Sequence, residues 1–237
     1  MKKFGLVIAA LAVGAFVSGQ AMAQSAKFAA NWKTNTVTLA EITVGAGDGR
    51  NTSTSGQITA AELMATIKVP QGKELLIGVS GVANLITFTE VKGKNKDGVI
   101  TAVAEATMDL EVRFAATGTD DVCNTAAGTV AVPGAITFAS RIQTLSIDVN
   151  LEVTGIETIT GYVTVALEND TTAAHHFNFL AVDLDSGEYD VWACFSGEAF
   201  KVTETESLAR AFVAIQQRIV TVQEVRAVKD ELIDSTP

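Results

Sequence analysis

Within the run from Val103 to Phe114, hydrophobic and polar residues alternate from Ala104 onward. One side of this stretch carries Ala104, Ala106, Met108, Leu110, Val112 and Phe114, and the other carries Glu105, Thr107, Asp109, Glu111 and Arg113. A repeat of two residues is typical of a strand with one buried and one solvated face, because a helix would distribute these side chains around its axis. The same alternation returns from Leu145 to Val153, so the pattern predicts two long half-buried strands.

Shorter apolar runs predict further strands, and a change of phase near Ala40 and Glu41 predicts a bulge in the first of them. Pro133-Gly134 indicates a hairpin between its two flanking runs, and Ala60 to Thr66 leaves a helical turn open as an alternative to a strand. The runs are Thr36 to Val44, Leu63 to Val69, Leu75 to Val79, Leu85 to Val91, Thr129 to Val132, Ile136 to Ser140, Tyr162 to Leu167, His176 to Val182 and Tyr189 to Phe195. About ten to twelve strands separated by regular turn signals are typical of an all-β sandwich or barrel, and we expect a jelly-roll-like β-sandwich.

The C-terminal segment fits two structures. Leu208, Phe212, Ile215 and Ile219 fall at helical spacing, which makes a helix from Glu206 to Arg226 a competitor. The branched residues that cluster from Ile219 to Val225 favour a pleated surface instead. We therefore favour two strands, Arg210 to Ile215 and Arg218 to Val225, joined at Gln216-Gln217.

The N-terminal segment has the pattern of a secretory signal peptide. Lys2 and Lys3 precede an apolar run from Phe4 to Val17, and Ala21-Met22-Ala23 provides the small residues of a cleavage site. The alternative, a membrane anchor, would need an apolar run of roughly 20 residues. The sequence predicts a signal peptide over residues 1–23, one β-sandwich domain over 24–237, and a secreted or periplasmic protein.

The charge balance narrows the choice of partners. The chain has 17 basic and 27 acidic residues and a formal charge of −10, which becomes −12 when Lys2 and Lys3 are removed with the signal peptide. Nucleic acid and anionic membrane surfaces are therefore poor candidates. No later run reaches the length of a membrane span, and an outer-membrane barrel would need more aromatic residues than the 6% present.

The two cysteines, Cys123 and Cys194, are predicted to form a disulfide because export exposes them to an oxidising environment. The alternative is two unpaired buried thiols. In the alternation of its strand Cys194 falls with Trp192, opposite Tyr189, Val191, Ala193 and Phe195, so the bond is expected on the Trp192 side.

Three segments carry a resemblance to known proteins. Leu75-Leu76-Ile77-Gly78-Val79-Ser80, His176-Phe177-Asn178-Phe179 and Thr221-Val222-Gln223-Glu224-Val225-Arg226 resemble strand cores of a group of uncharacterised secreted β-rich proteins. The last of these segments also resembles the closing strand of jelly-roll domains in surface and fibre proteins. The resemblance implies an architecture and no particular activity.

Catalytic patterns are weak throughout the sequence. His175 and His176, as neighbours on a strand, are expected on opposite faces and so cannot share one metal or substrate. Gly78-Val79-Ser80-Gly81 resembles a nucleophile elbow, but its second glycine comes one residue early, so Ser80 is interpreted as a strand or turn residue. Asp109 and Glu111 share a face as a glycosidase pair could, although a solvated strand surface explains them equally well.

Asp183, Asp185 and Glu188 form the best candidate for a cation site, because crowded carboxylates on a turn suit calcium. The simpler interpretation is a polar hairpin turn around Asp185-Ser186-Gly187.

From these observations we expect a non-enzymatic structural or interaction module without a cofactor, whose partner is an unidentified protein or glycan. A second hypothesis is a carbohydrate- or small-ligand-binding module in which Trp32, Tyr189 and Trp192 offer flat apolar surfaces. A third is a hydrolase that uses Asp109, Glu111 or His176 in one pocket. The sequence makes no prediction about the oligomeric state.

Overall fold

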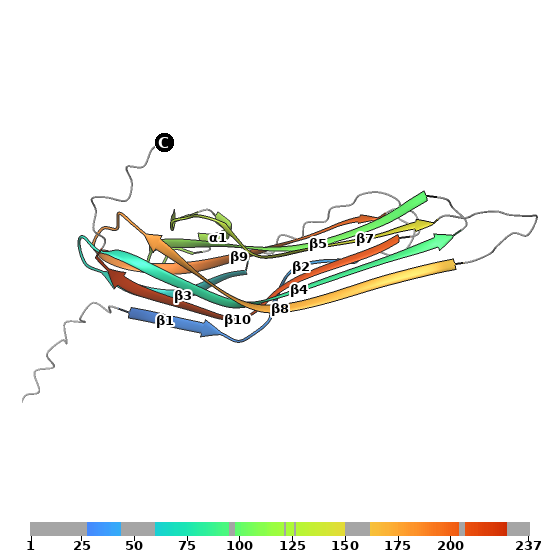
Figure 1. Ribbon diagram of the computed structural model, residues 1–237. Helices are drawn as coiled ribbons and strands as arrows, with labels where there is room; N and C mark the ends of the chain where they lie inside the picture. The colour runs from blue at the N-terminus through green and yellow to red at the C-terminus, as the bar shows by residue number, and fades with distance from the viewer. Residues whose placement is uncertain are drawn as a thin grey trace, which may run out of the picture.

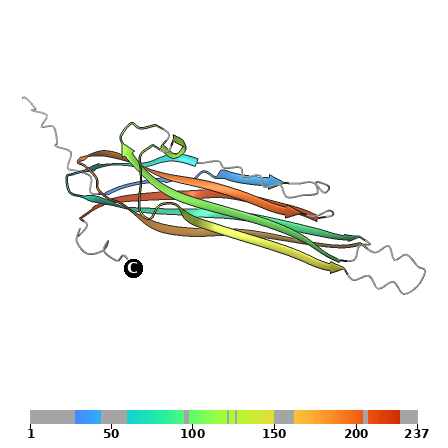
Figure 2. The same cartoon turned by 90° about the horizontal axis from the view of Figure 1, so that it is seen from above.

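A computed structural model describes residues 28–43, 60–94, 98–120, 122–125, 127–149, 162–203 and 207–226. Within these ranges two antiparallel sheets pack face to face in an elongated sandwich, as seen in two perpendicular views (Figures 1 and 2). The expected all-β sandwich is confirmed. The segment assigned to a signal peptide, residues 1–23, lies outside the described residues, and the jelly-roll arrangement stays a prediction.

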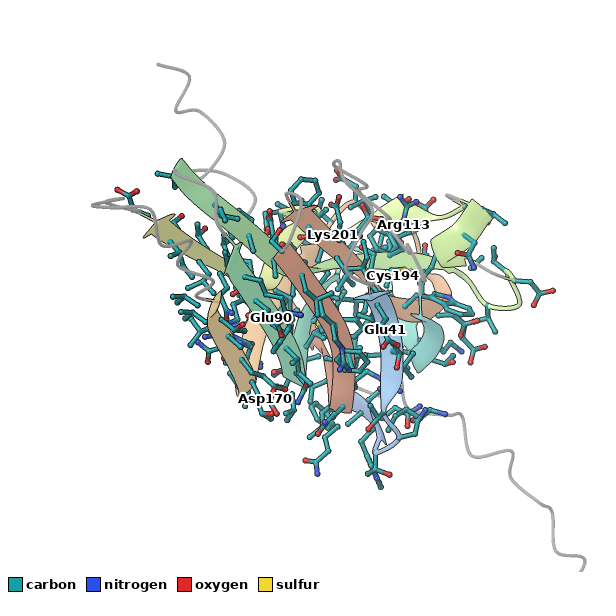
Figure 3. All side chains as sticks on the ribbon, turned by 90° about the vertical axis from the view of Figure 1, so that its right-hand side faces the viewer. Glu41, Glu90, Arg113, Asp170, Cys194 and Lys201 are labelled. Atoms are coloured by element: carbon teal, nitrogen blue, oxygen red, sulfur yellow. A yellow bond between two sulfur atoms is a disulfide. The ribbon has the colours of Figure 1, made fainter. Side chains whose placement is uncertain are left out.

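Sheet A has the order β1-β10-β4-β8, and β2 also pairs with β10. Its strands are β1 (Phe28–Lys33), β2 (Val37–Thr43), β4 (Glu74–Lys94), β8 (Tyr162–Ala181) and β10 (Ser207–Val225). Sheet B has the order β3-β9-β5-β6, and β7 also pairs with β5. Its strands are β3 (Ala60–Val69), β5 (Gly98–Ala116), β6 (Thr129–Val130), β7 (Ile136–Val149) and β9 (Gly187–Thr203). Figure 3 looks along the sandwich, with Arg113 and Cys194 on sheet B and Glu90 and Asp170 on sheet A.

Several predicted strands are parts of one longer strand. The runs Leu75 to Val79 and Leu85 to Val91 belong to β4, which has 21 residues and is therefore about 70 Å long. The strand continues through Gly81. Glycine is needed at this position because an added Cβ would lie 2.9 Å from Ile215 Cδ1 and collide with it. Gly81, which falls between the two predicted runs, is therefore a site of close packing inside the strand.

The same merging occurs in β8, which joins the two predicted strands Tyr162 to Leu167 and His176 to Val182, and in β7. The polar residues between the two halves of β8 are used in cross-strand contacts, since the Asn84 amide donates to Thr172 Oγ1 over 3.0 Å. Residues 150–153 of the strand predicted from Leu145 to Val153 lie outside the described residues.

The C-terminal segment is one strand, so both the helix and the hairpin at Gln216-Gln217 are wrong. β10 pairs with β4 from Ser207 to Val225, and the register shifts by one residue between Gln216 and Arg218. This bulge returns Arg218 to the interior, where its side chain is 1% exposed. The guanidinium donates to the Asn35 carbonyl over 2.9 Å and to Asn35 Oδ1 over 3.0 Å, which ties the β1–β2 connection to β10.

The hairpin predicted at Pro133-Gly134 is also wrong, because β6 and β7 pair with successive parts of β5 and not with each other. Between them, Val132 exchanges two backbone hydrogen bonds of 2.9 Å with Leu180 on sheet A. The segment therefore connects the two sheets at this edge. The predicted bulge in β2 is present, and its extra residue is Leu39.

The interior changes in character along the sandwich. At one end large side chains fill it, and Phe138 packs against Phe195 and Phe177 with ring centroids 5.4 and 5.6 Å away. All six residues on the apolar side of the alternating Val103 to Phe114 stretch, from Ala104 to Phe114, are buried, as their pattern predicts. Toward the other end the interior holds small and polar side chains, among them Thr87, Thr89 and Gln143. Gln143 accepts from Thr87 Oγ1 at 2.9 Å and donates to Thr89 Oγ1 at 2.8 Å, which satisfies these buried groups.

We predict that Gly197→Ala destabilises the fold by about 1–3 kcal/mol, because an added methyl group overpacks the interior between the sheets. A Cβ at Gly197 would lie 2.5 Å from Leu39 Cβ and 3.1 Å from Val213 Cγ1. Gly187→Ala on the same strand is the control, since its nearest neighbour, Tyr189 Cε2, would be 3.5 Å away. Urea unfolding should separate the two variants, and equal midpoints would contradict the close approach of β2 to β9.

Candidate functional site

The outer face of sheet A carries a chain of hydrogen bonds between neighbouring strands. Ser80 on β4 pairs with His176 on β8, and the hydroxyl lies 2.7 Å from His176 Nδ1. The other ring nitrogen, Nε2, lies 3.1 Å from Asn178 Oδ1. The chain forms because Gly78, opposite Asn178, has no side chain, and a Cβ there would lie 3.1 Å from His176 Cε1.

This chain is the end of a row that crosses four strands. The sheet registers place Trp32 beside Ile219, Ile219 beside Ser80, and Ser80 beside His176. Trp32 is 67% exposed and Ile219 is 47% exposed. We call this row the Trp32 row. It combines an apolar half and a polar half on the outer face of sheet A, across about 14 Å at ordinary strand spacing.

The Ser80–His176–Asn178 order resembles the order of nucleophile, base and orienting group in hydrolases. Such a centre also requires hydrogen-bond donors for the developing oxyanion. Here the backbone on both sides of Ser80 belongs to β4, which pairs with β8 along one edge and with β10 along the other, so the two ladders use its N–H groups. The arrangement fits a polar binding surface better than a nucleophilic centre.

The three aromatic residues proposed for ligand binding do not come together. Trp32 lies on the outer face of sheet A, whereas Trp192 lies on the outer face of sheet B, half-buried. The Trp192 Nε1 atom is buried without a hydrogen-bond partner among the described residues. Tyr189 packs edge-on against Phe114 at 6.3 Å, and its hydroxyl donates to the Asp185 carbonyl. Of the three, Trp32 is the residue with a broad exposed surface.

The acidic turn is not organised as a cation site. Asp183 and Asp185 line a surface pocket of about 320 Å³ together with Tyr189, but Glu188 is not part of its lining. Among the described residues, no group of three histidine, cysteine, aspartate or glutamate side chains is placed to hold a metal ion. Asp183 adopts a φ of 55°, which identifies this segment as a tight turn.

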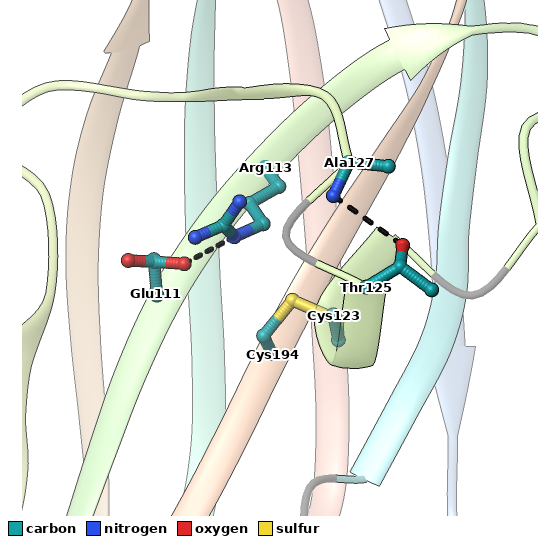
Figure 4. A network of polar contacts seen from close by, with 6 residues as sticks. All are labelled: Glu111, Arg113, Cys123, Thr125, Ala127 and Cys194. Carbon is teal, nitrogen blue, oxygen red and sulfur yellow. Dashed lines mark hydrogen bonds and ion pairs between the residues drawn. A yellow bond between two sulfur atoms is a disulfide. The ribbon is translucent and has the colours of Figure 1, made fainter.

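The predicted disulfide is confirmed. Cys123, on the short helix α1 (Val122–Thr125), bonds to Cys194 on β9, and the two Cα atoms are 5.6 Å apart (Figure 4). Cys194 lies on the outer face of sheet B with Trp192, as the alternation predicts, so the bond fastens α1 to that face. A structural disulfide is typical of proteins outside the reducing cytoplasm.

Asp109 and Glu111 line one pocket of about 310 Å³ beside the disulfide, together with Ser196. The Glu111 carboxylate is bound by the guanidinium of Arg113 on the same strand (Figure 4). Asp109, Glu111 and Arg113 share one face of β5 because side chains alternate along a strand. On this face the role of Glu111 is its ion pair with Arg113.

The position of Ser80 next to His176 is the feature that the sequence analysis missed. The two residues are 96 positions apart, and their meeting depends on the register of β4 with β8. The nearest sequence signal is Gly78 two residues before Ser80, because a glycine inside a strand often marks a close approach.

Comparisons with known proteins identify no family. No family model matches the chain, and no curated protein matches it. A solved structure of the infectious bursal disease virus Gx strain aligns with 85% of this chain and 42% of the viral chain, at 8% identity and a TM-score of 0.16. The chain thus spans less than half of the viral chain, and a TM-score of this size supports neither a shared fold nor a shared function.

No helix within the described ranges is both long and apolar enough to cross a membrane.

We predict that the two tryptophans differ strongly in access to solvent. The chain contains two, so Trp192→Phe leaves Trp32 as the single tryptophan, and Trp32→Phe leaves Trp192. Acrylamide should quench Trp32 much more steeply than Trp192, because Trp32 is 67% exposed. Equal quenching of the two variants would contradict the placement of Trp32 on an open sheet face.

Removal of the disulfide should destabilise the protein substantially. The bond spans 71 residues of sequence, and the chain-entropy model gives about 4 kcal/mol for a loop of this size. We expect no titratable thiol in the unfolded, unreduced protein, and a lower urea midpoint for the double variant Cys123→Ala/Cys194→Ala. Two titratable thiols per chain, or an unchanged midpoint, would contradict this.

Proposed function

We propose that the protein is a non-enzymatic structural or interaction module that works outside the cytoplasm, as a secreted or periplasmic β-sandwich with jelly-roll-like connections. The observation that carries this proposal is the length of its strands. β4, β5, β8 and β10 have 19 to 21 residues each, so they extend over most of the elongated molecule (Figure 1). Long paired strands hold distant surfaces in a fixed relation, which suits a load-bearing or spacing role.

Two further observations support this proposal. The disulfide fastens α1 to the sandwich, and disulfides of this kind persist in an oxidising compartment. The Ser80–His176–Asn178 chain lies on the outer face of the paired strands β4 and β8, and Glu111 is bound by Arg113. Both arrangements are accounted for by local polar contacts without a reaction.

The test is chemical cross-linking in cells that produce the full-length chain, followed by fractionation. We expect the protein in the extracytoplasmic fraction, processed after Ala23, and cross-linked to another macromolecule or to its own copies. Fluorophosphonate probes, which phosphonylate activated serines, should leave Ser80 unlabelled. A cytoplasmic monomer without cross-links would overturn the structural role, and labelling of Ser80 that is lost in His176→Ala would overturn the non-enzymatic role.

A second candidate function, glycan binding, is favoured by one observation, the exposure of Trp32 beside hydrogen-bonding side chains. An exposed indole offers an apolar surface to a sugar ring, and the row continues to Ser80 and His176 within the same surface. This function predicts that soluble oligosaccharides shift the fluorescence of the Trp192→Phe variant and leave that of Trp32→Phe unchanged. A glycan screen without any such shift would exclude it.

A further inference from the structure

Along the segment 163–167, no described strand pairs with the outer edge of β8. β8 is the last strand of sheet A, and among the described residues the contact on its far side is the bridge from Leu180 to Val132. Since backbone groups alternate in direction and the β4–β8 register has no shift, the N–H and C=O of Thr164 and Ala166 point the same way as those of Leu180. These groups therefore face away from β4 and form a template for another strand.

The same segment exposes apolar side chains that belong to the inner face. Val163, Val165 and Leu167 share the alternation of Phe179 and Ala181, which are buried between the sheets. Yet the three residues are 52%, 38% and 44% exposed. The small cluster that fills this end of the sandwich, formed by Val91, Ile100 and Ala102 with Leu145 and Ile147, does not include them.

Other edges carry the features that discourage pairing with a further strand. β1 and β2 have six and seven residues, and the β1–β2 connection interrupts that edge. On β3, Lys68 supplies a charge. The segment Val163-Thr164-Val165-Ala166-Leu167 has no charge, no proline and no glycine, so it has none of these protections.

We propose that two copies of this chain associate through antiparallel pairing of their β8 strands about Val165, which deepens the proposed function by naming its partner. In this register Val163 lies opposite Leu167 of the second copy and Val165 lies opposite Val165. Thr164 lies opposite Ala166, and the exchanged hydrogen bonds use the groups that face away from β4. Every inward-facing side chain in the pair is apolar, so the segment is complementary to itself.

The negative charge of the chain favours binding of a second copy at the uncharged β8 segment over binding elsewhere on the surface. The chain has a formal charge of −10, so most contacts between copies bring acidic surfaces together. In the proposed register the uncharged segment pairs with itself, and Glu168 lies opposite Tyr162. The two-fold arrangement would join both copies of sheet A into one continuous sheet. Because the contact is shorter than a standard protein interface, the dimer should be reversible and dependent on concentration.

The first experiment measures the mass of the purified protein by light scattering over a concentration series. The wild type should approach the dimer mass as concentration rises, and Val165→Lys should remain a monomer, because the substitution places two like charges opposite each other. Ile219→Lys is the matched control, since Ile219 is a 47% exposed aliphatic residue on β10, which β4 separates from β8, and its dimer should persist. A wild type that stays monomeric throughout, or equal loss of the dimer in both variants, would overturn the proposal.

A second experiment does not depend on the folding of a lysine variant. In Val165→Cys the new thiol is the one free cysteine beside the Cys123–Cys194 bond, and directly opposed residues are close enough for a disulfide. Mild oxidation should yield covalent dimers of Val165→Cys and leave Ala174→Cys, at an exposed position of the same strand, monomeric. Equal cross-linking of the two variants would overturn the register.

The outcomes separate this inference from the proposed function. A purified monomer that is still cross-linked to other macromolecules in cells would overturn the β8 pairing and leave the structural role standing. A dimer whose Ser80 reacts with fluorophosphonate would overturn the non-enzymatic role and leave the pairing standing.

Discussion

Antiparallel pairing along both edges of β4 holds sheet A together. One side of this strand pairs with β8 from Leu75 to Lys94, and the other pairs with β10 from Glu74 to Val91. Because side chains alternate between the faces of a sheet, a slip of one residue would exchange its inner and outer sets. The register therefore determines both the aromatic packing on the inner face and the Trp32 row on the outer face.

The interior shows how a sandwich this long stays closed. Near Phe138 and Phe195 large rings supply the buried apolar area. Farther along, the buried side chains of Ala104 and Ala199 are small and fill little of the interior. There Gln143 on β7 forms hydrogen bonds with Thr87, Thr89 and the Leu167 carbonyl. A hydrogen-bonded glutamine is directional in a way that apolar packing is not, so it fixes the relation of the two sheets where large side chains are few. The incomplete cover of β8 begins at this same end.

The sequence allowed prediction of those features that depend on neighbours along the chain. The alternation from Ala104 to Phe114 is uninterrupted, so the buried face of β5 could be predicted residue by residue. The disulfide could be predicted because two cysteines leave one pairing, and its face followed from the alternation around Cys194. Gly81 was misleading, because a glycine that ends a strand and one that admits Ile215 look alike in sequence. The Ser80–His176 contact and the separation of Trp32 from Trp192 follow from strand order and register, which local patterns do not contain.

The register of β4 with β8 can be measured through nuclear Overhauser contacts between α-protons. Non-hydrogen-bonded antiparallel pairs bring their Cα atoms to about 4.5 Å, so their α-protons lie close together. Since the backbone groups of even-numbered β8 residues face away from β4, we expect strong α-proton contacts between Ser80 and His176 and between Asn84 and Thr172. Strong contacts from Ser80 to His175 or Phe177 instead would show a slipped register, and would contradict both the Trp32 row and the inward direction of Val165.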